Sequence, residues 1–228
     1  MTDLILENIV ILWINNPANE KRNIHMKELL NKNFPSNPKY HIPAVNDKVR
    51  HKGITMAHTV AILKGIALNK PFIVLEDDVE IFDGANFQKL VEEYQRLAVK
   101  PKAIFLGLSI CGPNKSPKEI GNKRAGIKGD YIYFKNGALL KKATDHFVKV
   151  EKMYSAHSIL FVDMAFAEET VNENKKAIAN NKPHDVYYVN LQQRHLIYAL
   201  ADPWFYQSRE YRGQEIYTKF RILDIPKI

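Results

Sequence analysis

The chain has 228 residues, 46% of them hydrophobic and 25% charged, a composition that excludes a largely disordered chain, a collagen and a disulfide scaffold. Lys and Arg number 33 against 25 Asp and Glu, which gives a net charge of +8. This charge favours an anionic partner such as a nucleotide, a nucleic acid or an acidic membrane surface, with simple solubility as the alternative.

The sequence carries no signal for export or membrane insertion. Its one cysteine, Cys111, can form no internal disulfide. No stretch approaches the ~20 apolar residues of a membrane span. The first residues lack the basic region, apolar run and cleavage site of a signal peptide. We therefore expect a cytoplasmic protein.

Apolar patterns predict strands and helices in alternation. Continuous β-branched runs predict buried strands, and apolar residues spaced three and four apart predict helices. In chain order we predict a strand at 9–14, a helix at 18–32, a short strand near 40–42, a helix at 54–68, a strand at 72–75, a helix at about 86–98, a strand at 103–108, a loop at 112–129, a strand at 131–134, helices at 141–154 and 163–180, and short strands at 186–189 and 196–198. This alternation predicts a single α/β domain over residues 1–228, with a mixed, mostly parallel sheet flanked by helices.

Three consecutive carboxylates, Glu76, Asp77 and Asp78, follow the predicted strand at 72–75. Ligands of open α/β sheets bind at the carboxyl ends of strands. Because side chains alternate along a strand, we expect Glu76 and Asp78 on one side and Asp77 on the other. Their hard oxygens favour Mg²⁺ or Mn²⁺, which commonly bind one or two protein carboxylates together with substrate phosphates. The pattern predicts a metal site, with a solvated acidic turn as the alternative.

Other signatures of chemistry are absent from the sequence. It contains no H-E-x-x-H, C-x-x-C or EF-hand pattern, no complete Walker A loop, no G-x-G-x-x-G after the first predicted strand and no G-x-S-x-G. Zinc, dinucleotide and serine-hydrolase sites are therefore not expected.

A series of short motifs occurs in order along nearly the whole chain. They are Ile14-Asn15 followed by Arg22, Ala57-His58, Leu75-Glu76-Asp77-Asp78-Val79, Phe105-Leu106-Gly107, Gly137-Ala138, Val162-Asp163, and Pro203 with Gln207-Ser208. Together they resemble glycosyltransferase family 25, the lipopolysaccharide and collagen galactosyltransferase type. That family usually has Ser at the position of Ala57 and a Leu with tandem Arg in the first loop, so this chain resembles a divergent member.

The resemblance implies a fold and an activity. The fold is GT-A, in which a nucleotide-sugar half (about residues 1–110) and an acceptor half (about residues 111–228) share one sheet. The activity is metal-dependent transfer of a hexose from a nucleoside-diphosphate sugar, UDP-hexose, to a glycan, glycolipid or glycoprotein, in lipopolysaccharide or glycan biosynthesis. Inversion is implied, although a retaining GT-A enzyme would carry a similar acidic triplet.

Site roles follow from the resemblance and from residue chemistry. Mn²⁺ or Mg²⁺ is expected on Asp78 and Glu76, where it would neutralise the leaving diphosphate. The expected donor-binding residues are Asn15, Asn16, Arg22, His58, Lys64 and Asp77. Trp204 and Gln207 are expected at the acceptor. The alternatives are a plain turn for the two asparagines, a solvated helix position for Arg22, a structural role for His58 and core packing for Trp204.

Inversion in one displacement needs a carboxylate that accepts the proton of the acceptor hydroxyl. Asp163 matches the late Val-Asp motif and precedes a predicted helix, so it is a candidate base. An ordinary helix N-cap is the alternative, because Asp caps helices well. Glu168 and Glu169 are weaker candidates.

Two further function classes remain open at this stage. A nucleic-acid-binding module fits the charge, but the lysines are scattered, no recognition motif occurs, and the acidic triplet would repel phosphate, so no nucleic-acid partner is expected. A non-catalytic GT-A-like domain that binds sugar nucleotides is the second. The basic charge also allows peripheral membrane contact. The basic loop is either a lid or a solvated segment, and its cations are Lys115, Lys118, Lys123, Arg124 and Lys128.

Overall fold

The computed structural model describes residues 4–82, 84–108, 125–134, 137–208, 210 and 222–224. Its helices are α1 (Glu20–Asn33), α2 (Arg50–Leu68), α3 (Phe87–Arg96), α5 (Met164–Ala179) and α6 (His184–Arg194), with short 3-10 turns at Leu6–Asn8 and Ile222–Asp224. Its strands are β1 (Val10–Asn15), β2 (Lys39–Pro43), β3 (Phe72–Glu76), β4 (Val79–Ile81), β5 (Ala103–Phe105), β6 (Ala125–Lys128), β7 (Tyr131–Phe134), β8 (Leu139–Lys142), β9 (Phe147–Lys152), β10 (Ser158–Phe161), β11 (Ile197–Leu200) and β12 (Phe205–Gln207).

A ten-stranded mixed sheet forms the centre of the described structure, in the order β2-β1-β3-β10-β5-β11-β9-β8-β7-β6. β1 is parallel to β2 and β3, and β11 is parallel to β5, whereas β10 is antiparallel to both of its neighbours. The remaining pairs, from β11 to β6, are antiparallel. The strands β2, β1, β3, β5, β11, β8 and β6 therefore run one way, and β10, β9 and β7 run the other. The predicted mixed, mostly parallel sheet flanked by helices is confirmed.

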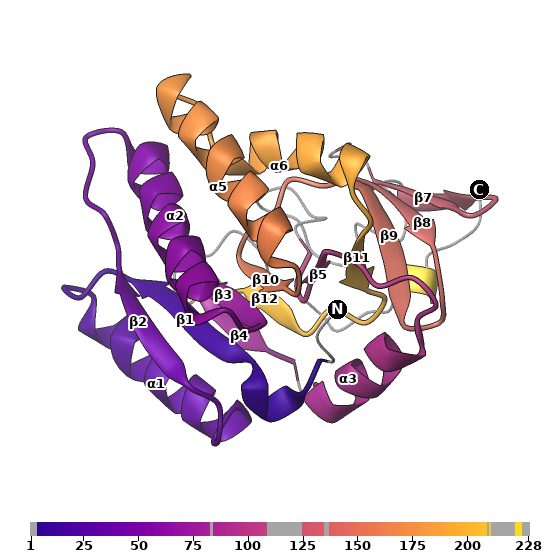
Figure 1. Ribbon diagram of the computed structural model, residues 1–228, viewed down its shortest axis with the longest axis horizontal. Coiled ribbons are helices and arrows are strands. Elements are labelled where there is room, and N and C mark those ends of the chain that lie inside the picture. Colours follow the sequence, from indigo (N-terminus) through magenta and orange to yellow (C-terminus); the bar gives the residue numbers. More distant parts are fainter. Residues whose placement is uncertain are drawn as a thin grey trace.

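Helices cover both faces of this sheet (Figure 1). Side chains alternate along β1, so Leu12 packs with α2 and α5 on one face while Ile11 and Trp13 pack with α1 and α3 on the other. Both faces are buried, which explains the continuous apolar run of β1. No described helix combines the length and the apolarity that crossing a bilayer requires.

The predicted helix at 141–154 is wrong, because β8 and β9 occupy this stretch. Val148 and Val150 of β9 are buried and alternate with half-buried Lys149 and Glu151. This is the two-residue period of a strand with one covered face. The lysine and glutamate content of the segment favoured a helix, and pairing with the neighbouring strands decides otherwise.

The predicted strand at 186–189 is also wrong, because these residues lie inside α6. A run of valine and tyrosine suggested a strand. The buried positions are instead spaced as on one face of a helix, and they are His184, Tyr188, Val189, Leu191 and Gln192. Tertiary packing overrides the local propensity here.

Strand direction determines which chain segments meet at each edge of the sheet. β1 leads through α1 to β2 on one side, and β2 leads through α2 back to β3 on the other. The carboxyl ends of β1 and β3 therefore flank a topological switch point, where open α/β sheets bind ligands. The antiparallel β10 begins at that edge, with Ser158 opposite Leu75, and ends at the opposite edge, with Phe161 opposite Phe72.

Candidate active site

A cleft of ≈ 320 Å³ lies at the switch point. Its volume falls in the range of roughly 300–1,000 Å³ that is typical of small-molecule sites. It is bounded by the ends of β1 and β3, by the loop before α2 and by the first half of α2. Its lining residues are Ile14, Asn15, Asn16, Arg22, Ala44, Val45, Asn46, Asp47, Arg50, Gly53, Ile54, Ala57, His58, Glu76, Asp77 and Asp78. Five of the six predicted donor-binding residues thus lie there together with Glu76 and Asp78, and the five are Asn15, Asn16, Arg22, His58 and Asp77.

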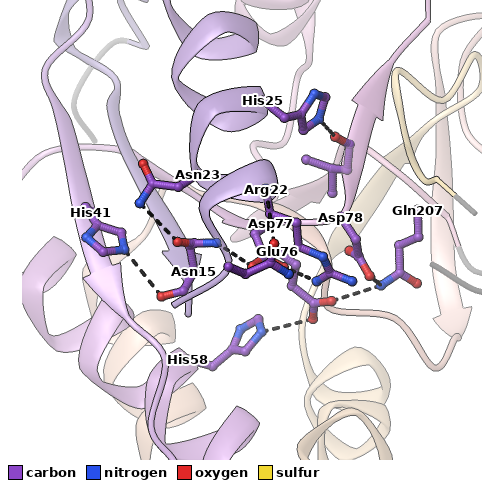
Figure 2. Close-up of polar contacts among 12 residues, drawn as sticks. Asn15, Arg22, Asn23, His25, His41, His58, Glu76, Asp77, Asp78 and Gln207 are labelled. Atoms are coloured by element: carbon purple, nitrogen blue, oxygen red, sulfur yellow. Dashed lines mark hydrogen bonds and ion pairs between the residues drawn. The ribbon is translucent and has the colours of Figure 1, made fainter. Parts of the chain in front are cut away.

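Asp77 holds two of the predicted donor-site residues in place (Figure 2). One carboxylate oxygen accepts a 2.6 Å hydrogen bond from the Asn15 amide, and the other forms an ion pair with the Arg22 guanidinium. Asn19 caps α1 by accepting a hydrogen bond from the backbone N–H of Arg22, which sets the start of this helix at the cleft. Both oxygens of Asp77 are therefore engaged. Asp77 positions Asn15 and Arg22 and has no free oxygen for a metal ion.

Glu76 and Asp78 converge on one amide group. The Gln207 Nε2 atom donates to Glu76 Oε2 at 2.9 Å and lies 3.3 Å from Asp78 Oδ1 (Figure 2). Gln207 reaches this point because β12 pairs with β4, with Gln207 opposite Val79. The expected alternation is therefore observed, with Glu76 and Asp78 facing Gln207 and Asp77 facing Asn15 and Arg22.

The two converging carboxyls are poorly ionised as they stand. Burial raises the pKa of Glu76 to about 7, and the negative charges of Asp77 and Asp185 act in the same direction. Burial and the charge of Glu76 raise the pKa of Asp78 to about 7, against the opposing effects of Arg22 and Gln207. A cation placed between them would favour the ionised form of both.

The residues present fit a hard divalent cation. Among the described residues, no three His, Cys, Asp or Glu side chains already converge as metal ligands. Mg²⁺ and Mn²⁺ sites in such enzymes nevertheless rely on one or two carboxylates, with phosphates and waters completing the shell. In this site the Gln207 NH₂ group lies between two carboxylates, where its partial positive charge takes the position that a cation would favour.

His58 lies beneath the cleft, on α2. Its Nε2 atom is 3.1 Å from Glu76 Oε1, and the imidazole is almost fully buried. Burial lowers the pKa of His58 to about 4, so at neutral pH the ring is uncharged and donates to the Glu76 carboxyl as a hydrogen bond, not an ion pair. His58 is thus a buried packing residue of α2 whose Nε2–H group also holds the Glu76 carboxyl at the cleft.

Asn16 and two residues that the sequence analysis missed lie at the mouth of the cleft. Asn16 is exposed and accepts a hydrogen bond from the backbone N–H of Ala18, so it both shapes the turn and lines the cleft. Arg50 at the start of α2 adds a second guanidinium to the lining. Gly53 lets the preceding loop approach, because a Cβ there would lie 2.2 Å from the Val45 carbonyl oxygen. Only the sheet order could have revealed Arg50.

Lys64 and Trp204 lie away from the cleft. Lys64 is exposed on α2, with its ammonium 5.0 Å from the centre of the Tyr40 ring. Trp204 is buried and packs edge-on against Phe87, with ring centroids 4.6 Å apart. It lines a separate cavity of ≈ 100 Å³ beside α3. Trp204 is therefore a core residue, which was the alternative to its expected place at the acceptor.

Asp163 is a helix cap at the opposite edge of the sheet, which corrects its interpretation as the catalytic base. Its carboxylate accepts from the Phe166 N–H at 2.8 Å and from Lys102 Nζ at 2.5 Å. Burial alone would raise its pKa, but these hydrogen bonds and the Lys102 charge hold the pKa below its usual value. The length of β3, about 13 Å, separates this edge from Glu76. Because β10 runs antiparallel, the residues that directly follow it lie at the edge of the sheet opposite the cleft. Glu168 and Glu169 follow Asp163 on α5 and share this displacement.

Gly107, in the Phe-Leu-Gly motif, permits a close approach beside the site. A Cβ there would lie 2.2 Å from His157 Nε2 and 2.5 Å from the Phe205 carbonyl oxygen. His157 in turn accepts the backbone N–H of Glu76 on its carbonyl oxygen at 3.0 Å. The glycine thus lets the start of β10 and the start of β12 close on the end of β3. In the basic loop only Lys128 lies within the described residues, at the end of β6, and the other four cations lie outside them.

Comparison with known proteins gives a distant likeness only. No protein-family model and no curated protein sequence matches the chain. Among solved structures, a CTP:phosphocholine cytidylyltransferase from Streptococcus pneumoniae matches with a TM-score of 0.42 and 11% identity, over 90% of this chain and 96% of that one. A mannose-1-phosphate geranyltransferase from Thermus thermophilus matches with a TM-score of 0.39 and 10% identity, over 88% of this chain and 76% of that one. Likenesses this distant carry no argument about activity, which the geometry of the site must indicate.

Proposed function

We propose that this protein is a metal-dependent glycosyltransferase that moves a sugar from a nucleoside-diphosphate sugar to a hydroxyl acceptor. The observation that carries the proposal is the convergence of Glu76 and Asp78 on one point of a cleft at the switch point of an α/β sheet. Burial raises the pKa values of both carboxyls to about 7, and a cation between them would favour the ionised form of each.

The cleft offers complementary charges for a diphosphate. Arg22 and Arg50 line it, and arginine binds phosphate oxygens through paired N–H groups. Asp77 fixes the Arg22 side chain, so this group is in place before a ligand binds. Mn²⁺ or Mg²⁺ on Asp78 and Glu76 would neutralise the diphosphate as it leaves.

The other cleft residues support binding and orientation of the donor. Asn16 is exposed at the end of β1, where it can hydrogen-bond a nucleoside or its ribose, whereas Asn15 is buried and its amide is held by Asp77. His58 fixes the Glu76 carboxyl from below, and Gln207 orients the same group from the acceptor side. The resemblance favours UDP-hexose as donor and a glycan, glycolipid or glycoprotein as acceptor. Cytoplasmic placement, peripheral membrane contact and the two functional halves of the chain stay predictions.

Thermal unfolding in the presence of nucleotide sugars tests this function. We expect one nucleotide class to raise the melting temperature only when Mn²⁺ or Mg²⁺ is present. A ligand at 100 times its dissociation constant adds about 2.7 kcal/mol, which corresponds to several degrees for a domain of this size. The Asp78→Asn variant is the matched control and should lose the metal-dependent part of the shift.

Three results would contradict the proposal in different ways. If no nucleotide shifts the melting temperature, the protein has no donor site of the kind proposed. If Asp78→Asn shows the same metal-dependent shift as the wild type, Asp78 does not bind the metal. Binding of an oligonucleotide without metal, with affinity that falls steeply as salt rises, would favour the nucleic-acid module instead.

A further inference from the structure

The start of α6 lies near the Glu76 carboxyl, with His58 between them. His184 stacks on His58 with ring centroids 4.4 Å apart, and its Nδ1 atom is 3.4 Å from Thr55 Oγ1 of α2. His58 in turn contacts Glu76. Asp185, the next residue of α6, is close enough for its negative charge to raise the pKa of Glu76. Contacts therefore lead from the Glu76 carboxyl through His58 to the first turn of α6.

Two polar atoms in this turn are buried without a hydrogen-bond partner among the described residues. They are Nε2 of His184, a residue that is 5% exposed, and Oδ1 of Asp185. Buried polar atoms are almost always paired, so two adjacent unpaired atoms in the turn that adjoins His58 and Glu76 indicate that a ligand supplies the partner. The Asp185 side chain as a whole remains partly exposed, which leaves its carboxylate within reach of such a ligand.

We propose that Asp185 is the catalytic base, which accepts the proton of the hydroxyl that attacks the donor sugar. This inference rests on the proposed function. The proposed function places the diphosphate on Glu76 and Asp78, and the first turn of α6 adjoins Glu76 across His58, so a sugar attached to the diphosphate can lie near this turn. Asp185 is the carboxylate that the fold places there, whereas Asp163 lies at the far edge of the sheet.

The surroundings of Asp185 suit this role. Burial raises the pKa of Asp185 above its usual value, which makes its carboxylate a stronger base, although the nearby backbone N–H of Val186 acts in the opposite direction. The titratable groups around it are Glu76 on β3, His58 on α2, and His184 and Tyr188 on α6. Burial lowers the pKa of both His58 and His184, so neither supplies a cation that would hold the proton back.

Transfer of the sugar requires only the donor, the acceptor hydroxyl and the Asp185 carboxylate. The acceptor oxygen forms a bond to the anomeric carbon while the bond from that carbon to the diphosphate oxygen breaks. The diphosphate leaves with the electron pair, and the hydroxyl proton moves to the Asp185 carboxylate. Water can replace the acceptor in the same step, and the products are then the free sugar and the nucleoside diphosphate.

Turnover of Asp185→Asn tests the assignment, with Asp163→Asn as the matched control. The assay measures nucleoside diphosphate released from the nucleotide sugar that stabilises the wild type, with water as acceptor. We expect Asp185→Asn to lose about 100-fold or more of the rate, which is the usual size of a general-base contribution, and to keep the full donor- and metal-dependent thermal shift. Asp163→Asn should turn over like the wild type, because Asn also caps helices.

A second variant separates a chemical role from a structural one. Asp185→Ala removes the carboxylate and leaves space, so added formate should restore part of the lost rate in this variant and have no such effect on the wild type. Wild-type turnover in Asp185→Asn, or no rescue of Asp185→Ala by formate, would overturn the role of Asp185 while leaving the donor site intact. Absence of any nucleotide shift in the wild type would overturn the proposed function itself.

Discussion

Asp77 and Asp78 are adjacent in the chain, but only Asp77 has hydrogen-bond or ion-pair partners for both of its oxygens that neutralise its charge. Asp77 is satisfied on both oxygens, by the Asn15 amide and the Arg22 guanidinium. Asp78 shares a single amide N–H group with Glu76 and is repelled by its neighbours. Residue type and spacing are the same, so only the partners distinguish a structural carboxylate from one suited to a cation.

Asp77→Ala should therefore destabilise the protein, and Asp78→Asn should not. Removing Asp77 leaves the half-buried Arg22 guanidinium and the buried Asn15 amide without their acceptor. We expect a loss of about 1–3 kcal/mol, which lowers the melting temperature by several degrees. Asp78→Asn removes a repulsive charge, so the melting temperature of the metal-free protein at pH 7 should stay the same or rise. Thermal unfolding in the presence of a chelator checks both. Equal destabilisation by the two substitutions would show that Asp78 is as well paired as Asp77.

Elements were predicted correctly where their pattern is set by burial on both faces. The runs that form β1 and β3 have no polar interruption, and the helices α1, α2 and α5 show apolar spacing, so these segments are recognisable without tertiary information. β9 and α6 were misassigned because their composition opposes the structure that packing imposes. β4 and β12 were missed, since each has three residues and is stable only through the other.

Part of the site could also be predicted from the sequence, because it follows a strand that its apolar run makes recognisable. Asp77, Glu76 and Asp78 follow a recognisable strand, and chain order alone places them at a ligand-binding edge. Asp163 also adjoins a strand, β10, but that strand runs antiparallel, and strand direction cannot be read from a single sequence. Gln207 was found by motif order, and its contact with Glu76, 131 residues away, depends on the pairing of β12 with β4.

The start of α2 packs closely against the loop before it, so Gly53→Ala should disturb the cleft. The added methyl group would lie 2.2 Å from the Val45 carbonyl oxygen, and backbone must move to relieve the contact. We expect the donor-dependent thermal shift to fall by half or more, because Val45 and neighbouring loop residues line the cleft.

Gly65→Ala is the control for this effect. Its methyl group would lie 2.5 Å from the Phe72 ring, on the same helix but away from the cleft. This variant should lower the melting temperature and keep the donor-dependent shift. Equal losses of the shift in both variants would mean that general destabilisation, and not the loop, controls donor binding.

At the scale of the whole molecule, buried ionisable groups near the cleft make stability depend on pH in two opposing ways. The carboxyls of Glu76 and Asp78 have pKa values raised to about 7 and hold protons that the unfolded chain releases near pH 4. Their contribution is full below the unfolded pKa and is lost as pH rises through 7. His58 and His157, whose pKa values are lowered to about 4 by burial, act oppositely, because the unfolded chain binds their protons below about pH 6.5.

A comparison with Asp78→Asn isolates the carboxyl contribution, because the histidines are common to both proteins and largely cancel. Between pH 5 and pH 8 the free energy of unfolding of the metal-free wild type should fall relative to that of the variant. The fall should run from pH 5 to about pH 7 and level off above that, because over this interval the folded carboxyl keeps a proton that the unfolded chain has already released. Urea unfolding at several pH values in the presence of a chelator measures this difference. Adding Mn²⁺ should reverse the trend for the wild type alone, since metal binding requires ionised carboxylates and strengthens as pH rises. A difference that does not change with pH would mean that Asp78 is ionised throughout, and the case for a cation between it and Glu76 would lose its electrostatic basis.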